Sequence, residues 1–138
     1  MSAFKNTKEL NKVMLALWHA IKADTNISSP LLKAKVSIRF YYREPESQLV
    51  VDCSDGQQMK IHVNQADFVP MVEMSMKSNF AHDFWLGKVN VPLALISGKI
   101  ASKGPVNRAL ALLPAIKPAF VFYPHIYENN TGRGIFDC

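Results

Sequence analysis

The chain has 138 residues, of which 49% are hydrophobic and 20% are charged, and its formal net charge is +5 at pH 7. A chain of this size and composition forms one globular domain without needing disulfides or a metal, and intrinsic disorder is excluded. The longest apolar run, residues 109–116, is far shorter than the ~20 residues that cross a bilayer.

The first predicted element is an amphipathic helix near the N-terminus. Apolar residues recur there at helical spacing, so they share one face. These residues are Leu10, Val13, Met14, Leu17, Trp18 and Ile21. Asn6 followed by Glu9 resembles a capping box and predicts the start of the helix. We expect the helix to end near Asp24, before a turn-rich segment at residues 25–30.

A three-stranded antiparallel meander is predicted next. Residues 36–43 alternate between apolar and polar side chains, which is the period of a half-buried strand. Residues 48–53 and 57–63 form two further strands, and Asp55-Gly56 supplies the hairpin turn between them. Residues 72–77 alternate in the same way and predict a fourth strand.

Two short helices are expected after the fourth strand. Ser78 or Asn79 can cap the first helix, and Gly87 ends it, because glycine adopts the left-handed conformation at a helix end. Asn90 can cap the second helix, which Gly98 ends in the same way.

The remaining predicted elements are a fifth strand at residues 99–103 and a helix at residues 105–113. Pro114 and Pro118 limit the continuation of this helix, because proline has no N–H group to donate. The expected fold is α+β, with a five-stranded, largely antiparallel sheet that helices cover on one face.

Candidate catalytic and metal-binding residues are scarce. No two of the four histidines have the i, i+4 spacing that places two metal ligands on one helix face. His82 precedes Asp83, but adjacent helical residues point about 100° apart, so a structural role is favoured over a hydrolase centre. Cys53 and Cys138 are too far apart for a Cys-x-x-Cys motif. We expect no catalytic residue, no metal and no cofactor.

The positive charge is concentrated in one segment. Residues 74–127 carry six basic side chains and a single acidic one, Asp83. The basic residues are spaced singly rather than clustered, which favours a solvated cationic surface over a nucleic-acid site. Anionic membrane surfaces and acidic ligands stay open as partners. The polar N-terminus lacks the apolar region of a secretory signal, so we expect a cytoplasmic protein.

The same part of the chain is rich in large and flexible apolar side chains. Residues 68–122 contain many methionine, phenylalanine and leucine residues, more than short helices on one face of a sheet readily bury. The pattern alone allows two interpretations, a plain core or an apolar cavity in which methionines adapt to a pliable ligand.

Glycine spacing provides a resemblance to a known family. Residues 86–100 resemble the signature of the sterol carrier protein family, also called non-specific lipid-transfer domains. The matching positions are Gly87, Lys88, Asn90, Ala94, Gly98, Lys99 and Gly104. The order of elements over roughly residues 6–117 is also similar. Pro92 stands one place later than the family's usual Asn-Pro, and Pro105 replaces a common Asp or Asn.

This resemblance implies a sheet and helices that enclose an apolar tunnel, in a protein that is not an enzyme. We expect residues 1–117 to form the lipid-binding domain and residues 118–138 an aromatic extension that acts as a lid or a docking segment. The candidate ligand-binding residues are Phe80, Phe84, Trp85, Leu93, Ile96, Leu110, Leu113 and Phe120.

Two functions follow from the resemblance. The first is a soluble carrier that holds a sterol, fatty acid, acyl-CoA or phospholipid, or another hydrophobic small molecule, with transient contact to anionic membrane surfaces. The second is a non-catalytic accessory domain that presents a lipophilic intermediate, such as a quinone precursor, to a partner enzyme. Neither function involves nucleic acid.

Overall fold

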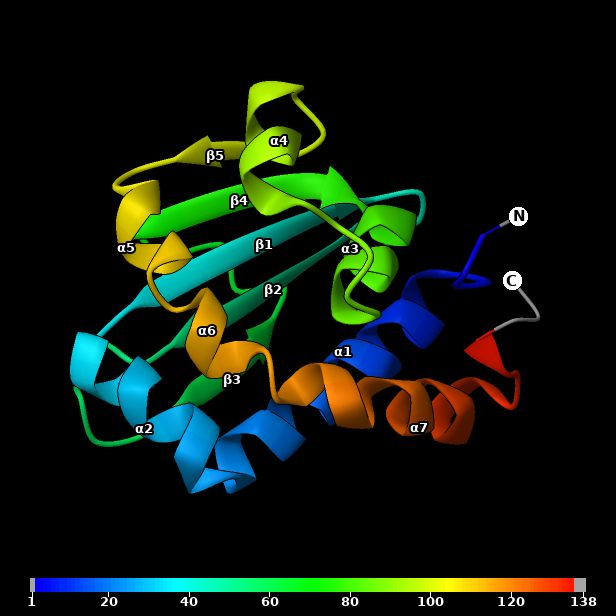
Figure 1. The fold of residues 1–138 in the computed structure, drawn as a ribbon, viewed down its shortest axis with the longest axis horizontal. Helices are drawn as coiled ribbons and strands as arrows, with labels where there is room; N and C mark the ends of the chain where they lie inside the picture. The colour runs from blue at the N-terminus through cyan, green and yellow to red at the C-terminus, as the bar shows by residue number, and fades with distance from the viewer. Residues whose placement is uncertain (1, 136–138) are drawn as a thin grey trace.

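A computed structural model describes residues 2–135 and confirms the α+β architecture (Figure 1). Five strands form one sheet in the order β3-β2-β1-β4-β5. The strands are β1 (Ser37–Arg43), β2 (Ser47–Asp52), β3 (Lys60–Val63), β4 (Val72–Lys77) and β5 (Ala101–Lys103). The helices are α1 (Thr7–Ala23), α2 (Thr25–Ala34), α3 (Ser78–Trp85), α4 (Val91–Ile96), α5 (Val106–Leu110), α6 (Leu113–Ile116) and α7 (Ala119–Thr131).

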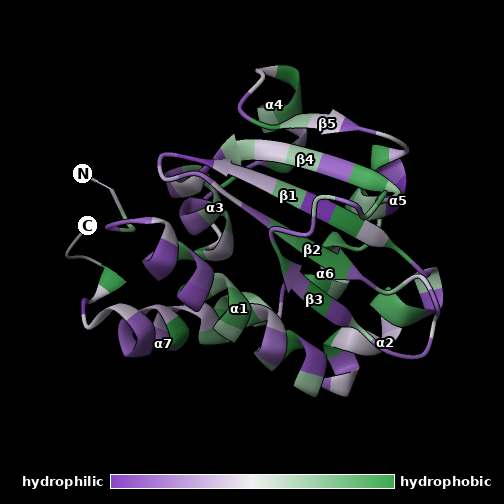
Figure 2. Ribbon diagram, turned by 180° about the vertical axis from the view of Figure 1, so that it is seen from behind, coloured by the Kyte–Doolittle hydropathy of each residue, from purple (hydrophilic) through white to green (hydrophobic). Residues whose placement is uncertain are grey.

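The sheet is largely antiparallel, as predicted. Strand β1 pairs with β2, β2 with β3, and β4 with β5 in antiparallel register. The exception is the central pair β1 and β4, which is parallel and aligns Phe40 with Met74 and Tyr42 with Met76. Helices cover the face of the sheet that is turned to the viewer in Figure 1, whereas Figure 2, seen from behind, shows β1 and β4 with no helix in front of them.

The first helix forms as its sequence predicts, but the segment after it does not. The Asn6 side chain caps α1 by accepting a hydrogen bond from the Glu9 N–H group at 2.9 Å. The turn predicted for residues 25–30 is wrong, because these residues belong to α2. Asp24 serves both helices: its N–H group donates to the Ala20 carbonyl, and its side chain accepts from the Asn26 N–H group at 3.0 Å. A second helix can therefore start without a loop.

Two further helix boundaries differ from the prediction. Helix α3 begins at Ser78 with no side-chain cap, because the Ser78 hydroxyl donates to the Glu44 carbonyl and the Asn79 side chain accepts from the Ala3 N–H group. The single helix predicted for residues 105–113 is divided into α5 and α6. Pro114 lies in the first turn of α6, where its missing N–H group is tolerated.

Strand β1 is buried on both faces around Arg39. Its apolar face packs on the helices, as the alternation predicts, but Arg39 on the opposite face is only 5% exposed. The guanidinium donates to the Gln65 carbonyl at 2.7 Å and to the Phe68 carbonyl, and it lies 3.5 Å from the Glu73 carboxylate. The loop between β3 and β4 therefore folds over the back of the sheet, where these polar partners compensate the buried charge.

Gly104 allows β5 to approach β4. Its φ angle is +91°, and a Cβ atom there would lie 2.2 Å from the Met71 carbonyl oxygen. Any other residue would force the backbone apart, since that oxygen belongs to the main chain. This steric requirement gives a physical reason for one glycine of the signature.

Residues 2–135 contain neither a single membrane-spanning helix nor a group of metal ligands. No single helix among residues 2–135 is long and apolar enough to cross a membrane; only the pair Val106–Ile116 and Ala119–Thr131, bent by 82°, would pass by length and composition. No group of three or more potential metal ligands occurs in this part of the chain. Cys53 is buried, and burial raises the pKa of its thiol to about 11, whereas Cys138 lies outside the described residues.

Candidate functional site

An apolar cavity of about 80 Å³ lies between the covered face of the sheet and the helices. Side chains from β1, β4 and helices α1 to α6 contribute to its wall. They are Trp18, Leu31, Ile38, Phe40, Tyr42, Met74, Met76, Phe80, Ala81, Phe84, Trp85, Val91, Ile100, Ala109, Leu110, Leu112, Leu113 and Ile116. None of these side chains carries a charge, so the cavity favours apolar groups over ions.

The wall has a closed side and a looser side. Trp18, Trp85 and Met76 are 3%, 4% and 6% exposed, so they form a closed base. The residues contributed by α5 and α6, apart from Ala109, are only half-buried, and both helices are short. Helices α5 and α6 therefore form the more loosely packed side of the cavity.

Five of the eight sequence-derived candidates line this cavity. They are Phe80, Phe84, Trp85, Leu110 and Leu113. Phe120 does not line it but packs behind it, with its ring centroid 5.3 Å from that of Phe84 and 5.9 Å from that of Trp85. A direct contact of any of these residues with a ligand stays a prediction.

Leu93 and Ile96 lie elsewhere. They are 59% and 84% exposed, because α4 turns Val91 and Ala94 toward the interior instead. Pro92, Leu93 and Ile96 form an exposed apolar surface, which we call the α4 patch. Exposed Lys88 and Lys99 flank it along the chain, and exposed Lys117 shares a groove with Pro92.

Sequence reasoning missed the part of the wall that comes from the first half of the chain. Ile38, Phe40 and Tyr42 were recognised as the apolar face of a strand, and Trp18 as part of a helix face. The alternation along β1 and β4 is the signal that could have placed Phe40, Tyr42, Met74 and Met76 together, because residues of one parity share a sheet face.

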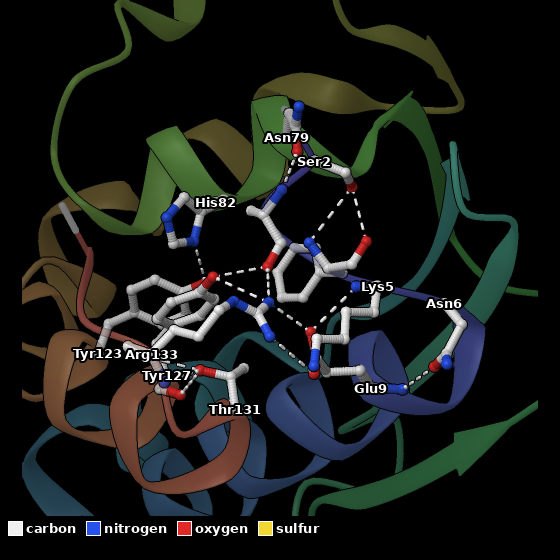
Figure 3. A network of polar contacts seen from close by, with 12 residues as sticks. Ser2, Lys5, Asn6, Glu9, Asn79, His82, Tyr123, Tyr127, Thr131 and Arg133 are labelled. Carbon is white, nitrogen blue, oxygen red and sulfur yellow. Dashed lines mark hydrogen bonds and ion pairs between the residues drawn. The ribbon is translucent and has the colours of Figure 1, made fainter. Parts of the chain in front are cut away.

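A second buried cluster joins the N-terminal segment, α3 and α7 through polar contacts (Figure 3). His82 Nδ1 lies 2.7 Å from the Tyr123 hydroxyl, and the Tyr127 hydroxyl donates to the Ala3 carbonyl at 2.6 Å. Arg133 pairs with Glu9 at 2.6 Å and donates to the same Ala3 carbonyl at 2.8 Å. We call these residues the polar cluster.

The polar cluster gives His82 a structural role. Burial lowers the pKa of His82 to about 4, so its ring is neutral at physiological pH. Its nearest ring neighbours are Phe4, Tyr123 and Tyr127, whereas the side chain of Asp83 is exposed. His82 is also absent from the cavity wall. These rings and the Tyr123 hydroxyl hold the His82 ring in place.

Comparison with known proteins identifies the fold. No protein-family model and no curated protein matches the sequence. The structure is similar to the sterol carrier protein domain 2 of Helicoverpa armigera, with a TM-score of 0.65 and 22% identity over 87% of this chain and 96% of that one.

Two further structures extend this likeness. A UbiJ-SCP2 ubiquinone synthesis protein has a TM-score of 0.59 and 10% identity, over 82% of this chain and 93% of that one. The palmitated SCP2L2 protein of Aedes aegypti has a TM-score of 0.55 and 21% identity, over 72% of this chain and 90% of that one. The chain therefore has the sterol carrier protein 2 fold, as the glycine signature suggested.

Proposed function

We propose that this protein is a lipid carrier that holds one hydrophobic molecule in the cavity between its sheet and its helices. The observation that carries the proposal is the uncharged wall of that cavity, built from residues far apart in the sequence. The structure of palmitated SCP2L2, a protein of the same fold, supports it. Desolvation would provide the affinity, at about 0.8 kcal/mol for each buried methylene group.

The cavity must widen to hold a long ligand. At about 80 Å³ it is smaller than the ~150 Å³ cavity that takes up benzene in an engineered protein. Met74 and Met76 can change shape at low cost because their side chains are unbranched. Outward movement of α5 and α6 would add the remaining space. The protein would thus exchange between a closed form and a wider, loaded form.

We also propose a role for the aromatic extension, residues 118–138, as a lid. Phe120 backs the cavity-lining rings of Phe84 and Trp85, and α7 packs along α1. Any movement that opens the Phe84 side of the cavity must displace Phe120. The extension would therefore slow ligand exchange without touching the ligand.

Loading and unloading would occur at an anionic membrane surface, through the α4 patch. Leu93 and Ile96 can enter the headgroup region while Lys88, Lys99 and Lys117 contact anionic lipids. No acidic residue occurs in residues 84–127 to oppose this attraction. Vesicle binding should require anionic lipid and should fall in a Leu93→Ser, Ile96→Ser double variant. Val69→Ser is the control, because Val69 is 87% exposed on the β3–β4 loop instead.

A second candidate function is that of an accessory domain that presents a lipophilic intermediate to a partner enzyme. The similarity in fold to a ubiquinone synthesis protein favours it. In that case the α4 patch would contact the partner rather than a membrane. The double variant would then lose partner binding and leave vesicle binding unchanged.

Filling the cavity tests the carrier proposal. Ala109 lies on the wall and is 8% exposed, whereas Ala111, two residues later, is exposed. Ala109→Leu should reduce uptake of a fluorescent fatty acid at least tenfold while the protein stays folded, and Ala111→Leu should leave uptake unchanged. Equal uptake by both variants, or no uptake by the unmodified protein, would overturn the proposal. Ala81→Leu repeats the test from α3 should Ala109→Leu fail to fold.

A further inference from the structure

One residue that lines the cavity, Trp18, carries a buried hydrogen-bond donor with no partner among the described residues. Trp18 is 3% exposed, and its Nε1 atom has no hydrogen-bond partner among the described residues. Burying a polar group without a partner is unfavourable, so such groups are rare and call for an explanation. The same residue lines the cavity.

Aromatic neighbours do not supply this missing partner. Trp18 meets Phe40 at a centroid distance of 5.9 Å and Trp85 at 5.7 Å, the latter almost perpendicular. An aromatic face is at best a weak acceptor for an N–H group. A carbonyl or hydroxyl oxygen on a bound molecule would be a far better one.

The chemistry of the wall restricts which oxygen can be bound there. With no basic side chain on the wall, a carboxylate or phosphate inside the cavity would be an unpaired buried charge. A neutral ketone, ester, quinone or alcohol oxygen carries no such penalty. It can also accept a hydrogen bond from the indole N–H group.

Resting on the proposed carrier function, we infer that the ligand is a neutral amphiphile whose oxygen accepts a hydrogen bond from Trp18 Nε1 at the closed side of the cavity. The ligand then enters with its polar end first, and its hydrocarbon part faces α5 and α6. A charged lipid would bind the other way round, with its headgroup at the surface. Trp18 is in this sense a specificity-determining residue.

Indole resonances of the unmodified protein test the inference directly. The chain has two tryptophans, so protein labelled at tryptophan gives two indole N–H signals, and Trp85→Phe assigns the one from Trp18. The probes are a long-chain methyl ketone and the alkane with the same number of carbons. We expect both to bind, and only the ketone to move the Trp18 indole proton downfield, as a new hydrogen bond requires.

Affinity gives a second readout. Trp18→Phe removes the donor and keeps an aromatic ring, so it should weaken ketone binding about tenfold relative to alkane binding. Trp85→Phe is the matched control on the same wall and should change both affinities alike.

The outcomes separate this inference from the function on which it rests. If neither probe binds, the carrier proposal itself fails. If both bind while the Trp18 proton stays in place and Trp18→Phe affects them equally, the cavity is a carrier site without a polar subsite, and the inference is overturned. The indole measurement needs no Trp18 variant, so it tests the hydrogen bond from Trp18 even if Trp18→Phe does not fold.

Discussion

Where the N-terminal segment, α3 and α7 meet, buried polar atoms have partners, whereas the indole nitrogen of the cavity-lining Trp18 has none among the described residues. In the polar cluster, His82 and Tyr123 contact one another and Tyr127 bonds to the main chain. Both regions are aromatic and buried, so apolar content alone does not distinguish them. The paired groups of the polar cluster stabilise the fold, whereas the unpaired Trp18 donor beside a cavity is the feature on which the proposed ligand contact rests.

The largest expected effect comes from removing a ring of the polar cluster. Tyr127 is fully buried, so Tyr127→Ala should lower the free energy of unfolding by about 4 kcal/mol. Fatty-acid uptake by the folded fraction should be unchanged, because Tyr127 does not line the cavity. Urea unfolding and uptake measured on the same sample check this. If folded Tyr127→Ala protein took up less fatty acid, the polar cluster and the cavity would not be independent of one another.

The Glu9–Arg133 ion pair of the same cluster should make stability depend on pH. The hydrogen bond from Arg133 is the main cause that lowers the pKa of Glu9, so the pair stabilises the fold above the ordinary pKa of a glutamate. This stabilisation is lost as the pH falls through the lowered pKa. Glu9→Gln should cost about 2 kcal/mol at pH 7 and flatten the pH dependence of unfolding below pH 5.

An exposed ion pair provides the control for Glu9→Gln. Lys77 and Glu44 lie 3.3 Å apart with side chains 65% and 70% exposed. Lys77→Gln should therefore change stability by less than about 0.5 kcal/mol. A similar loss from both variants would mean that the buried setting of Glu9 and Arg133 adds nothing.

Removing single hydroxyl groups sharpens the comparison. Tyr127→Phe loses the hydrogen bond to the Ala3 carbonyl and should cost about 1 kcal/mol. Tyr42 lines the cavity, is 5% exposed and makes no hydrogen bond through its hydroxyl to any described residue. Tyr42→Phe should therefore be neutral or slightly stabilising. Thermal unfolding of the two variants measures this difference in stability. An equal loss of stability in both would contradict the assignment of a paired hydroxyl to Tyr127 and an unpaired one to Tyr42.

The smallest effect on stability is expected at the α4 patch. Leu93→Ser and Ile96→Ser should each change the free energy of unfolding by less than about 0.5 kcal/mol, because both side chains are exposed. A loss well above 1 kcal/mol in urea unfolding would show that these residues belong to the core.

Regular periodicity made much of the fold predictable from the sequence. Helix α1 and strand β1 follow their apolar spacing, and Gly87 and Gly98 have the positive φ angles that the helix ends require. Helix α2 was missed because its start depends on a single residue, Asp24, that also ends α1. Local turn propensity cannot reveal such a shared cap.

The candidate site was predictable only in part, because its wall depends on tertiary packing. Helix α4 has six residues and is apolar around its circumference, so its sequence cannot tell that Ala94 faces inward and Leu93 outward. Trp18 was recognised as buried, but its unpaired nitrogen depends on what surrounds it in the folded protein. The methionine- and phenylalanine-rich pattern allowed a cavity and the resemblance to the sterol carrier family favoured one, but most of its wall could be assigned only from the structure.

Methionine methyl resonances provide the most direct test that the cavity receives the ligand. Met74 and Met76 line it, whereas Met14 and Met59 are each 1% exposed in other parts of the core. On titration with a long-chain ligand, we expect large shifts of the Met74 and Met76 methyl signals and small shifts of the Met14 and Met59 signals. Unchanged Met74 and Met76 signals under saturating ligand would contradict a binding site between the sheet and the helices.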